Sequence, residues 1–216
     1  MAIPELNKIY QGDCLEIMKG WPDKCVDLII TDPPYGMNYK SNHYKNGNPH
    51  SEIHGDNAYP IGALNDMFRI SRGGVFSFMR WNNLSQVPTP KSFIAWIKNN
   101  WTAGDLEHEY GRQWEGCAFW PQEEHRFITR PADVIDARRI PPGDIVHPTE
   151  KPIAVIYQII AANAGAIILD PFCGSGTTLV AAERLGRKWI GIELDQKYVA
   201  IAQSRIDAEL AQGKLF

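Results

Sequence analysis

The chain has 216 residues, a net charge of −3, and 44% hydrophobic and 22% charged residues, which is ordinary for a soluble globular protein. No apolar run reaches the roughly 20 residues of a membrane span, and the N-terminus lacks the basic-then-apolar pattern of a signal peptide, so we expect no membrane contact and a cytoplasmic location. The four cysteines form no CxxC pair and do not cluster with histidines, which argues against disulfides and against a bound metal.

Apolar runs of strand length alternate along the chain with stretches of helical periodicity. The run CVDLIIT is continuously apolar, as expected for a parallel strand that is buried on both faces. In chain order, we predict a strand at 7–13, a helix at 14–21, a strand at 25–31, a helix at 60–74, strands at 74–79, 92–97 and 116–120, irregular structure at 130–148, a helix at 149–165, a strand at 166–170, a helix at 178–186, a strand at 188–193 and a helix at 195–210. The alternation predicts a single α/β domain over 1–216, a doubly wound, mostly parallel sheet with helices on both faces.

Local signals predict where two of these helices begin and end. The helix at 60–74 has Pro60 near its start and Gly73 to close it. The helix at 149–165 has Thr149 as a candidate cap, Pro152 in its first turn and Gly165 at its end. The segment 37–59, between the predicted strand at 25–31 and the predicted helix at 60–74, is rich in Asn, His, Gly and Tyr, and we expect a mobile loop there.

The stretch AIILDPFCGSGTTLVAAERLG reads as a strand, a Gly-x-Gly turn and a helix, with Glu193 at the end of the next strand. This spacing is typical of sites where glycines admit a ligand to the backbone and an acid holds ribose hydroxyls. The turn lacks the lysine of a phosphate-binding loop and begins with the carboxylate of Asp170, which suits a cation better than a pyrophosphate. S-adenosylmethionine carries an amine, a sulfonium and a ribose but no phosphate. The alternative is that Gly174 and Gly176 only make a tight turn.

Two predicted strands end in the same way, LIITDPPY at Asp32 and IILDPFCG at Asp170. Consecutive prolines stop a strand and stiffen the chain that follows. Because the carboxyl ends of parallel strands meet at one edge of a sheet, we expect both acids to face one crevice. One corner would hold the cofactor, and the other would present a second, flat substrate.

The motifs DPPY, HPTEKP and DPFCGSGTT, in this order, resemble those of the DNA amino-methyltransferases of the permuted, beta type. The resemblance covers both ends of the chain and matches its middle more loosely. It implies a Rossmann-like S-adenosylmethionine-dependent methyltransferase fold with one antiparallel strand and a circularly permuted motif order. It also implies a reduced target-recognition insertion over approximately 81–148, together with the last strands of the sheet.

The resemblance assigns catalysis to the tetrad Asp32, Pro33, Pro34 and Tyr35. Asp32 and the Pro33 carbonyl would accept the two hydrogens of an exocyclic amine, and Tyr35 would stack on the base. A base inside a duplex must first be flipped out, at a cost of a few kcal/mol, and stacking worth roughly 1–3 kcal/mol offsets it. No metal is needed.

The resemblance also implies the cofactor contacts. Glu193 would hold the ribose hydroxyls, Asp13 the adenine amine, and Thr149 with Lys151 the methionine carboxylate at a helix start. The full implied set is Asp13, Cys14, Thr149, Lys151, Asp170, Phe172, Gly174, Ser175, Gly176, Thr177 and Glu193. As alternatives, Lys151 is a solvated helix residue, Asp13 closes a turn, and Cys14 and Cys173 are small buried fillers.

These residues lead to a methyltransferase acting on the N6 amine of adenine in double-stranded DNA, because Asp opens the tetrad. N4-cytosine methylation is the runner-up, and a non-catalytic module that binds DNA and cofactor is the alternative from another class. A nucleotide-dependent oxidoreductase is a weaker hypothesis, because it gives the DPPY motif no function. With little room for a recognition domain, we expect a short target sequence or a homodimer, and Lys40, His43 and Lys45 near phosphates.

Overall fold

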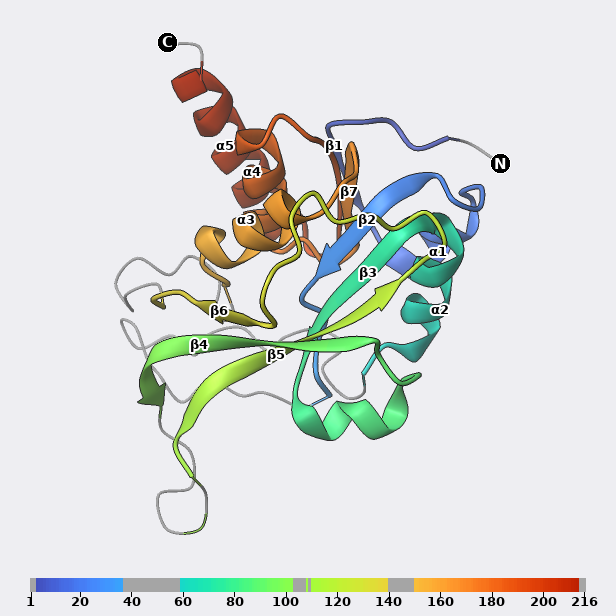
Figure 1. Ribbon diagram of the computed structural model, residues 1–216. Helices are drawn as coiled ribbons and strands as arrows, with labels where there is room; N and C mark the ends of the chain where they lie inside the picture. Colours follow the sequence, from blue (N-terminus) through green and yellow to red (C-terminus); the bar gives the residue numbers. More distant parts are fainter. Residues whose placement is uncertain (1–2, 37–58, 103–107, 109, 140–149, 214–216) are drawn as a thin grey trace.

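The computed structural model describes residues 3–36, 59–102, 108, 110–139 and 150–213. Its centre is one eight-stranded sheet in the order β1-β8-β7-β2-β3-β5-β4-β6 (Figure 1). The strands are β1 (Lys8–Gln11), β2 (Val26–Thr31), β3 (Ser71–Met79), β4 (Ser92–Thr102), β5 (Arg112–Pro121), β6 (Val134–Asp136), β7 (Ile167–Asp170) and β8 (Lys188–Glu193). Seven of them were predicted as strands from their apolar runs, and β6 was not.

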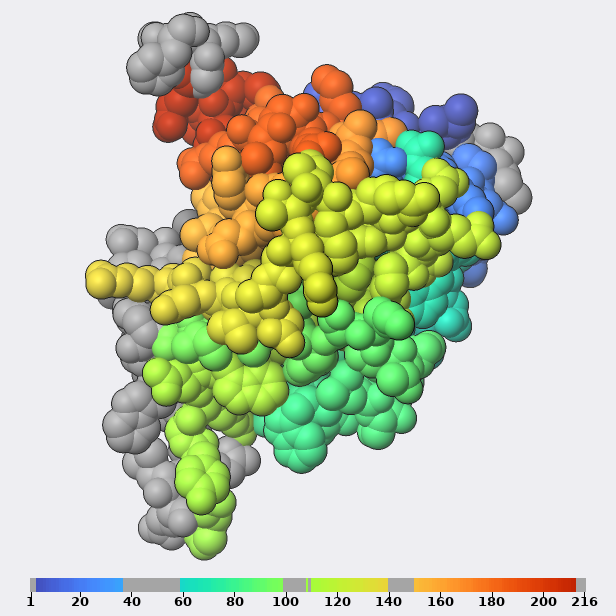
Figure 2. Space-filling model, viewed as in Figure 1, coloured from blue at the N-terminus to red at the C-terminus, as the bar shows by residue number. Residues whose placement is uncertain are grey.

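The strand directions confirm the predicted sheet. β1, β8, β7, β2 and β3 are parallel neighbours, β5 runs against both β3 and β4, and β6 is parallel to β4. One strand, β5, is therefore antiparallel to all the others of the described sheet. Figure 2 shows the segment 110–139, in yellow-green and yellow, lying across one face of the molecule between the C-terminal third and residues 80–95.

Helices cover both faces of the sheet, as the alternation predicted. α1 (Cys14–Lys19) and α2 (Ile61–Ile70) bury Met18, Leu64 and Met67 in one core cluster. α3 (Ile153–Ala162), α4 (Thr177–Arg184) and α5 (Gln196–Gly213) bury Ile156, Leu179 and Ile206 in the cluster on the other face. The remaining helical turn is the 3₁₀ helix η1 (Trp81–Gln86), which follows β3. Within the described ranges, no helix combines the length and apolar character that crossing a membrane requires.

The predicted role of Gly73 as a helix terminator is wrong. α2 ends at Ile70, and the backbone of Ser71 is already extended, with φ −86° and ψ 134°. Gly73 lies inside β3, where a Cβ atom would come within 2.6 Å of the Asp27 carbonyl oxygen. The glycine is therefore required by the close approach of β3 to β2 and not by the end of the helix.

The structure also corrects the ends of α3 and the stretch before it. Pro152 is the N-cap of α3 and not a first-turn residue, and the helix ends at a cap formed by Asn163, before Gly165. The Asn163 side chain donates to the Ile159 carbonyl at 2.7 Å, so it satisfies a helix-end acceptor locally. β6 was predicted as irregular because three residues are too few to show a periodicity.

Asp27 joins the beginnings of β2 and β7. Its Oδ2 atom accepts the backbone N–H groups of Ala166 and Ile167 at 2.6 and 2.8 Å, and its Oδ1 atom accepts from Arg72 Nε at 2.5 Å. The strands then run in register, with Leu28 opposite Ile168. This carboxylate therefore helps to set which residues stand side by side where the two strands end.

Replacing Asp27 with Ala removes three hydrogen bonds, two of them to backbone groups of a central strand. We expect the free energy of unfolding, measured with urea, to fall by about 2–4 kcal/mol. Asp23→Ala is the matched control, because Asp23 makes an ion pair with Arg69 while 71% of its side chain is exposed. That change should lower the free energy of unfolding by less than about 1 kcal/mol, and equal losses in the two variants would contradict the role given to Asp27.

Candidate active site

The carboxyl ends of the five parallel strands bring the predicted acids to one edge of the sheet. β7 lies between β8 and β2, so Asp170 stands between Glu193 and Asp32 along this edge. Asp13 follows β1 next to β8, where the Gly12 N–H donates to the Glu193 carbonyl at 2.9 Å. Residues more than 150 positions apart in the chain therefore meet because the strand order is not the chain order.

The two Asp-Pro corners open into one cleft. The Thr31 hydroxyl, one residue before Asp32, donates to Asp170 Oδ1 at 2.7 Å. The cleft is lined by residues from both corners and from the segment before α3: Thr31, Asp32, Phe78, Glu150, Lys151, Ile156, Asp170, Phe172, Cys173, Gly174, Ser175, Thr177 and Thr178. The expected proximity of the corners is thus what the structure shows, while the chemical roles of these residues stay predictions.

Asp170 is a buried carboxylate with several donors around it. Its Oδ1 atom accepts from the Thr31 hydroxyl and, at 3.1 Å, from the Phe172 backbone N–H. Burial raises the pKa of Asp170 to about 6, against the opposing effect of hydrogen bonds from Thr178, Thr31 and Phe172. A buried carboxylate of this kind gains most from a cation placed in the cleft beside it.

The glycine turn has the backbone conformation that its sequence predicts. Gly174 and Gly176 have φ of 50° and 83°, in the left-handed region that favours glycine. Glu193 Oε2 accepts the Gly174 N–H at 2.8 Å, and its Oε1 accepts the Asp195 N–H at 2.9 Å. Burial raises the pKa of Glu193 above its ordinary value. The acid predicted to hold a ribose therefore also holds the turn itself in place.

Arg205 of α5 is a site residue that sequence reasoning missed. Its guanidinium donates to the Ser175 carbonyl and hydroxyl, both at 2.8 Å, and to the Thr177 hydroxyl at 3.3 Å. The same side chain forms an ion pair with Glu150 at 2.8 Å. It thereby ties the glycine turn to the segment before α3, a link for which helical periodicity contains no signal.

The side chains of Asp32 and Tyr35 contact one another across the tetrad. The Tyr35 hydroxyl donates to Asp32 Oδ1 at 2.5 Å, and Asn83 Nδ2 donates to the Tyr35 carbonyl at 3.1 Å. Burial, together with the charges of Asp32 and Glu115, raises the pKa of Tyr35 well above its ordinary value. The phenol therefore stays protonated and acts as a donor to the carboxylate.

Lys151 is buried against Asp32, where the sequence prediction assigned it to the cofactor. Its Nζ atom lies 2.6 Å from Asp32 Oδ2, 3.1 Å from Glu115 Oε2 and 3.3 Å from the Tyr35 hydroxyl. Burial alone would lower the pKa of Lys151, but the charges of Asp32 and Glu115 outweigh it and raise that pKa. The ammonium donates to Asp32 and Tyr35 and lies at ion-pair distance from Glu115, so a cofactor carboxylate would have to compete with these contacts.

Glu115 and Lys98, on the neighbouring strands β5 and β4, complete this cluster. Glu115 Oε1 lies 2.5 Å from Lys98 Nζ, and only 7% of the Lys98 side chain is exposed. Burial would raise the pKa of Glu115, but the charges of Lys151 and Lys98 lower it to about 2. Neither residue was predicted, because an isolated charge in an apolar strand is indistinguishable in sequence from a solvated one.

Asp13 and Cys14 have structural partners at the start of α1. Asp13 Oδ1 accepts the Leu15 N–H at 2.8 Å as the helix cap, which agrees with its alternative reading as a turn-closing residue. Cys14 and Cys173 are buried, and burial raises the pKa of Cys14 to about 12. Burial also raises the pKa of Cys173, and the burial of both thiols fits their alternative interpretation as packing groups.

Four of the predicted contacts lie outside the described residues: Thr149, Lys40, His43 and Lys45. The expected loop at 37–59 also lies outside them apart from Tyr59. Among the residues that the structure does describe, no group of three or more His, Cys, Asp or Glu side chains is arranged to hold a metal ion.

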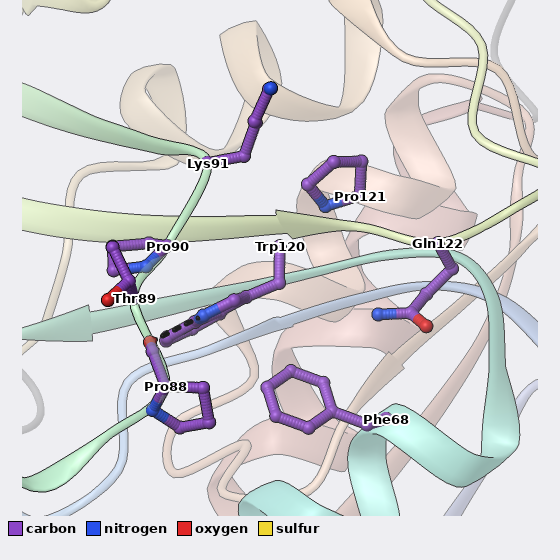
Figure 3. A pocket seen from close by; sticks show the side chains of 8 residues that line it. All are labelled: Phe68, Pro88, Thr89, Pro90, Lys91, Trp120, Pro121 and Gln122. Carbon is purple, nitrogen blue, oxygen red and sulfur yellow. Dashed lines mark hydrogen bonds between the residues drawn. The ribbon is translucent and has the colours of Figure 1, made fainter.

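A larger hollow, of about 630 Å³, lies at the opposite edge of the sheet (Figure 3). Pro121 of β5 is paired with Gly74 near the start of β3, whereas the cleft lies where β3 ends. The lining is mostly apolar: Phe68, Pro88, Thr89, Pro90, Lys91, Trp120, Pro121 and Gln122. Without an acid or a close pair of polar groups, this hollow is not the site that the motifs predict.

Comparisons with known proteins show which family the chain resembles. The sequence model of the DNA methylase family matches residues 81–204, more than half of the chain. The type II methyltransferase M.HinfI of Haemophilus influenzae is 26% identical over 93% of this chain and 68% of its own. The protein in the crystal structure of the M1.HpyAVI–SAM complex has 27% sequence identity to this chain. The two structures have a TM-score of 0.64, and the match covers 92% of this chain and 98% of the other.

A further solved structure, the PvuII DNA methyltransferase described as cytosine-N4-specific, has a TM-score of 0.70 over 92% of this chain and 85% of its own. At 17% identity, that likeness shows the fold alone. The solved structures thus confirm the predicted Rossmann-like fold, and one of them carries the name of a cytosine enzyme.

Because Asp170 is buried, we predict that the free energy of unfolding falls as the pH rises toward neutral. The folded chain keeps the Asp170 proton up to about pH 6, whereas an ordinary Asp has a pKa of 3.8, so between these values the folded state binds more protons. The contribution of Asp170 to the free energy of unfolding must then fall as the pH rises through this window, by about 3 kcal/mol in all. Asp170→Asn should match the wild type near pH 4 and exceed it by about this amount at pH 7.

Urea unfolding of the two chains from pH 4 to pH 7 measures this difference, in which the titrations of all other groups cancel. Asp23→Asn, at an exposed carboxylate, is the control and should track the wild type throughout. A difference between wild type and Asp170→Asn that does not change with pH would refute the assignment.

Proposed function

The chain belongs to the N6/N4 family of DNA methyltransferases, and from this premise we propose that it methylates the N6 amine of adenine in double-stranded DNA. Its cofactor is S-adenosylmethionine, which supplies an electrophilic methyl group on a sulfonium. The observation that carries the proposal is the common cleft, with the Asp32 carboxylate on one wall and the glycine turn with Asp170 on the other. A methyl group can pass between two occupants only if their sites share such a space.

The donor set of the cleft fits this cofactor. The turn offers bare backbone at Gly174, and the nearest carboxylate, Asp170, suits a positively charged group. Glu193 uses each oxygen once for the backbone, so it retains lone pairs for the two hydroxyls of a ribose. We propose that these residues hold the cofactor, with Asp13, Cys14, Phe172, Ser175, Gly176, Thr177 and Thr149 completing its surroundings.

Asp32 is proposed to make the base amine nucleophilic. An aryl amine is a poor nucleophile because its lone pair is delocalised into the ring. Asp32 and the Pro33 carbonyl, fixed by Pro34, would accept its two hydrogens and direct the lone pair at the methyl carbon, and positioning supplies much of the rate. The nitrogen forms a bond to this carbon as the carbon–sulfur bond breaks with its electron pair on sulfur, and one amine proton passes to Asp32 and then to water.

We propose that the base reaches Asp32 by flipping out of the duplex and stacking on Tyr35. Flipping costs a few kcal/mol, and stacking on an aromatic ring returns roughly 1–3 kcal/mol. The Tyr35 side chain is held by its hydroxyl at Asp32, and Asn83 holds its backbone carbonyl. Such a fixed ring is a better platform than a free one because it loses little entropy on binding.

The segment 81–148 is proposed to read the target. Among its described aromatic residues, Trp96 and Trp120 are buried and donate to backbone carbonyls, whereas Trp81 is 68% and Tyr110 100% exposed. Trp81 begins η1, directly after the strand next to β2, so it lies at the cleft edge of the sheet. We propose that these exposed rings contact DNA. Because the segment is small, we also propose that the chain recognises a short target sequence or shares the recognition with a second copy in a homodimer.

Identification of the methylated base tests the choice of adenine. DNA treated with the chain and tritiated cofactor should yield N6-methyladenine after digestion to nucleosides and mass analysis. Aspartate at the head of the tetrad supports adenine, and N4-methylcytosine as the product would replace adenine by cytosine while keeping the mechanism at Asp32.

Removal of the Asp32 carboxylate should separate catalysis from cofactor binding. We expect Asp32→Ala to slow single-turnover methyl transfer by at least ~100-fold, because an acceptor aimed at the reacting group is lost. Cofactor affinity, measured by calorimetry, should stay within about threefold, since the glycine turn and Glu193 are untouched. Asp207→Ala, at an exposed carboxylate on α5, is the control. Full activity of Asp32→Ala would show that the amine is not activated there.

A further inference from the structure

Glu115 is a carboxylate with 29% of its side chain exposed but a buried Oε2 atom, and the proposed mechanism does not yet use it. Its Oε2 atom is the buried side-chain oxygen or nitrogen without a hydrogen-bond partner in the described part of the chain. The nearest cation is Lys151, whose Nζ lies 3.1 Å away, at ion-pair distance but without hydrogen-bond geometry. Buried acceptors are rarely left in this state, so the unfilled position requires an explanation.

Asp32, in contrast, has both oxygens engaged. Oδ1 accepts from Tyr35 at 2.5 Å, and Oδ2 accepts from Lys151 at 2.6 Å. An ammonium in direct contact neutralises the carboxylate and weakens it as an acceptor for an amine hydrogen. The charge on Lys151 must therefore move away from Oδ2 before Asp32 can polarise the base fully.

Glu115 is the second carboxylate that the Lys151 ammonium already contacts, with Nζ 3.1 Å from its Oε2 atom. The Lys151 side chain is 7% exposed, and its Nζ lies 5.2 Å from the ring centre of Phe78 and 5.7 Å from that of Tyr35. An ammonium left without a carboxylate in such surroundings is strongly disfavoured. Glu115 already contacts the same ammonium, and Lys98 at 2.5 Å holds its other oxygen in place.

Resting on the function proposed for Asp32, we propose that the Lys151 ammonium moves from Asp32 Oδ2 to Glu115 Oε2 when the target amine binds. Glu115 is then a positioning residue: it never touches the base, but it takes up the cation that would otherwise compete with the base for Asp32. The four charges of Lys98, Glu115, Lys151 and Asp32 sum to zero in both arrangements. The movement exchanges one contact of the ammonium for another between two carboxylates that flank it, and it leaves Asp32 with the Tyr35 hydroxyl and the hydrogens of the bound amine as its donors.

The charge and the shape of Glu115 can be tested separately. Glu115→Gln keeps the shape and removes the charge, so Lys151 should stay on Asp32, and single-turnover methyl transfer to duplex DNA should slow by at least tenfold. Glu115→Asp keeps the charge on a shorter side chain and should recover most of the rate. Cofactor affinity should remain within twofold in both variants, because the glycine turn is untouched. Glu123→Gln is the matched control, since Glu123 forms an exposed ion pair with Lys24.

A second variant covers the case in which Glu115→Gln does not fold. Lys98→Met with Glu115→Gln removes a neutral pair of charges, leaves Lys151 balanced by Asp32, and should show the same slow transfer in a folded chain. Transfer at the wild-type rate in Glu115→Gln or in the double variant would overturn the inference. So would a Glu115→Asp chain slower than Glu115→Gln, which would assign Glu115 to packing.

The same experiment keeps the two proposals apart. If the wild type methylates cytosine, the proposed base is wrong, while the ratio of rates between wild type and variants still tests Glu115 on the cytosine amine. If the wild type transfers no methyl group to any base, both the proposed function and the inference fail. If the wild type methylates adenine and the Glu115 variants match it, only the inference fails.

Discussion

The hydrogen bond from the Thr31 hydroxyl to the Asp170 carboxylate joins the ends of two neighbouring parallel strands, and the site depends on that adjacency. At the other end of the same strands, Asp27 holds the N–H groups of Ala166 and Ile167, where β7 begins. With both ends tied, a register slip between β2 and β7 would break several bonds at once. The two Asp-Pro corners are consequently fixed with respect to each other before any ligand binds, and a reaction between two bound groups needs that degree of order.

The second constraint is the balance of buried charge. Asp32 lies in partly buried surroundings beside an aromatic ring, with 20% of its side chain exposed, and a carboxylate placed there needs a paired cation. Lys151 supplies that cation at 2.6 Å, but a cation that close also competes with the substrate for the carboxylate. The antiparallel strand β5 supplies Glu115 and its neighbour β4 supplies Lys98, so the core holds two acids and two bases in alternation. In the proposed mechanism, this one cluster therefore stabilises the site before the base binds and frees Asp32 for the amine when the base arrives.

Most of the fold could be predicted from local pattern, because buried strands and amphipathic helices leave periodic apolar signals. The failures have specific causes. Gly73 was interpreted as a helix stop, but it is a strand residue required by the nearby Asp27 carbonyl. Asn163, and not Gly165, ends α3 through a side-chain bond to Ile159. β6 escaped notice because three residues show no period. For Gly73 the deciding contact is to a neighbouring strand and therefore lies outside the window in which the pattern was sought.

The sequence by itself determined the strand ends that carry Asp32 and Asp170, the glycine turn and the acid of Glu193, because each of these is encoded in a few consecutive residues. Only the tertiary structure decided what stands beside them. It placed Arg205 on the glycine turn, and it turned Lys151 toward Asp32 and Glu115. The physical reason is that ion pairs between distant segments depend on strand order and side-chain direction. The sequence around a single Lys, Arg or Glu does not show whether its side chain is solvated or buried.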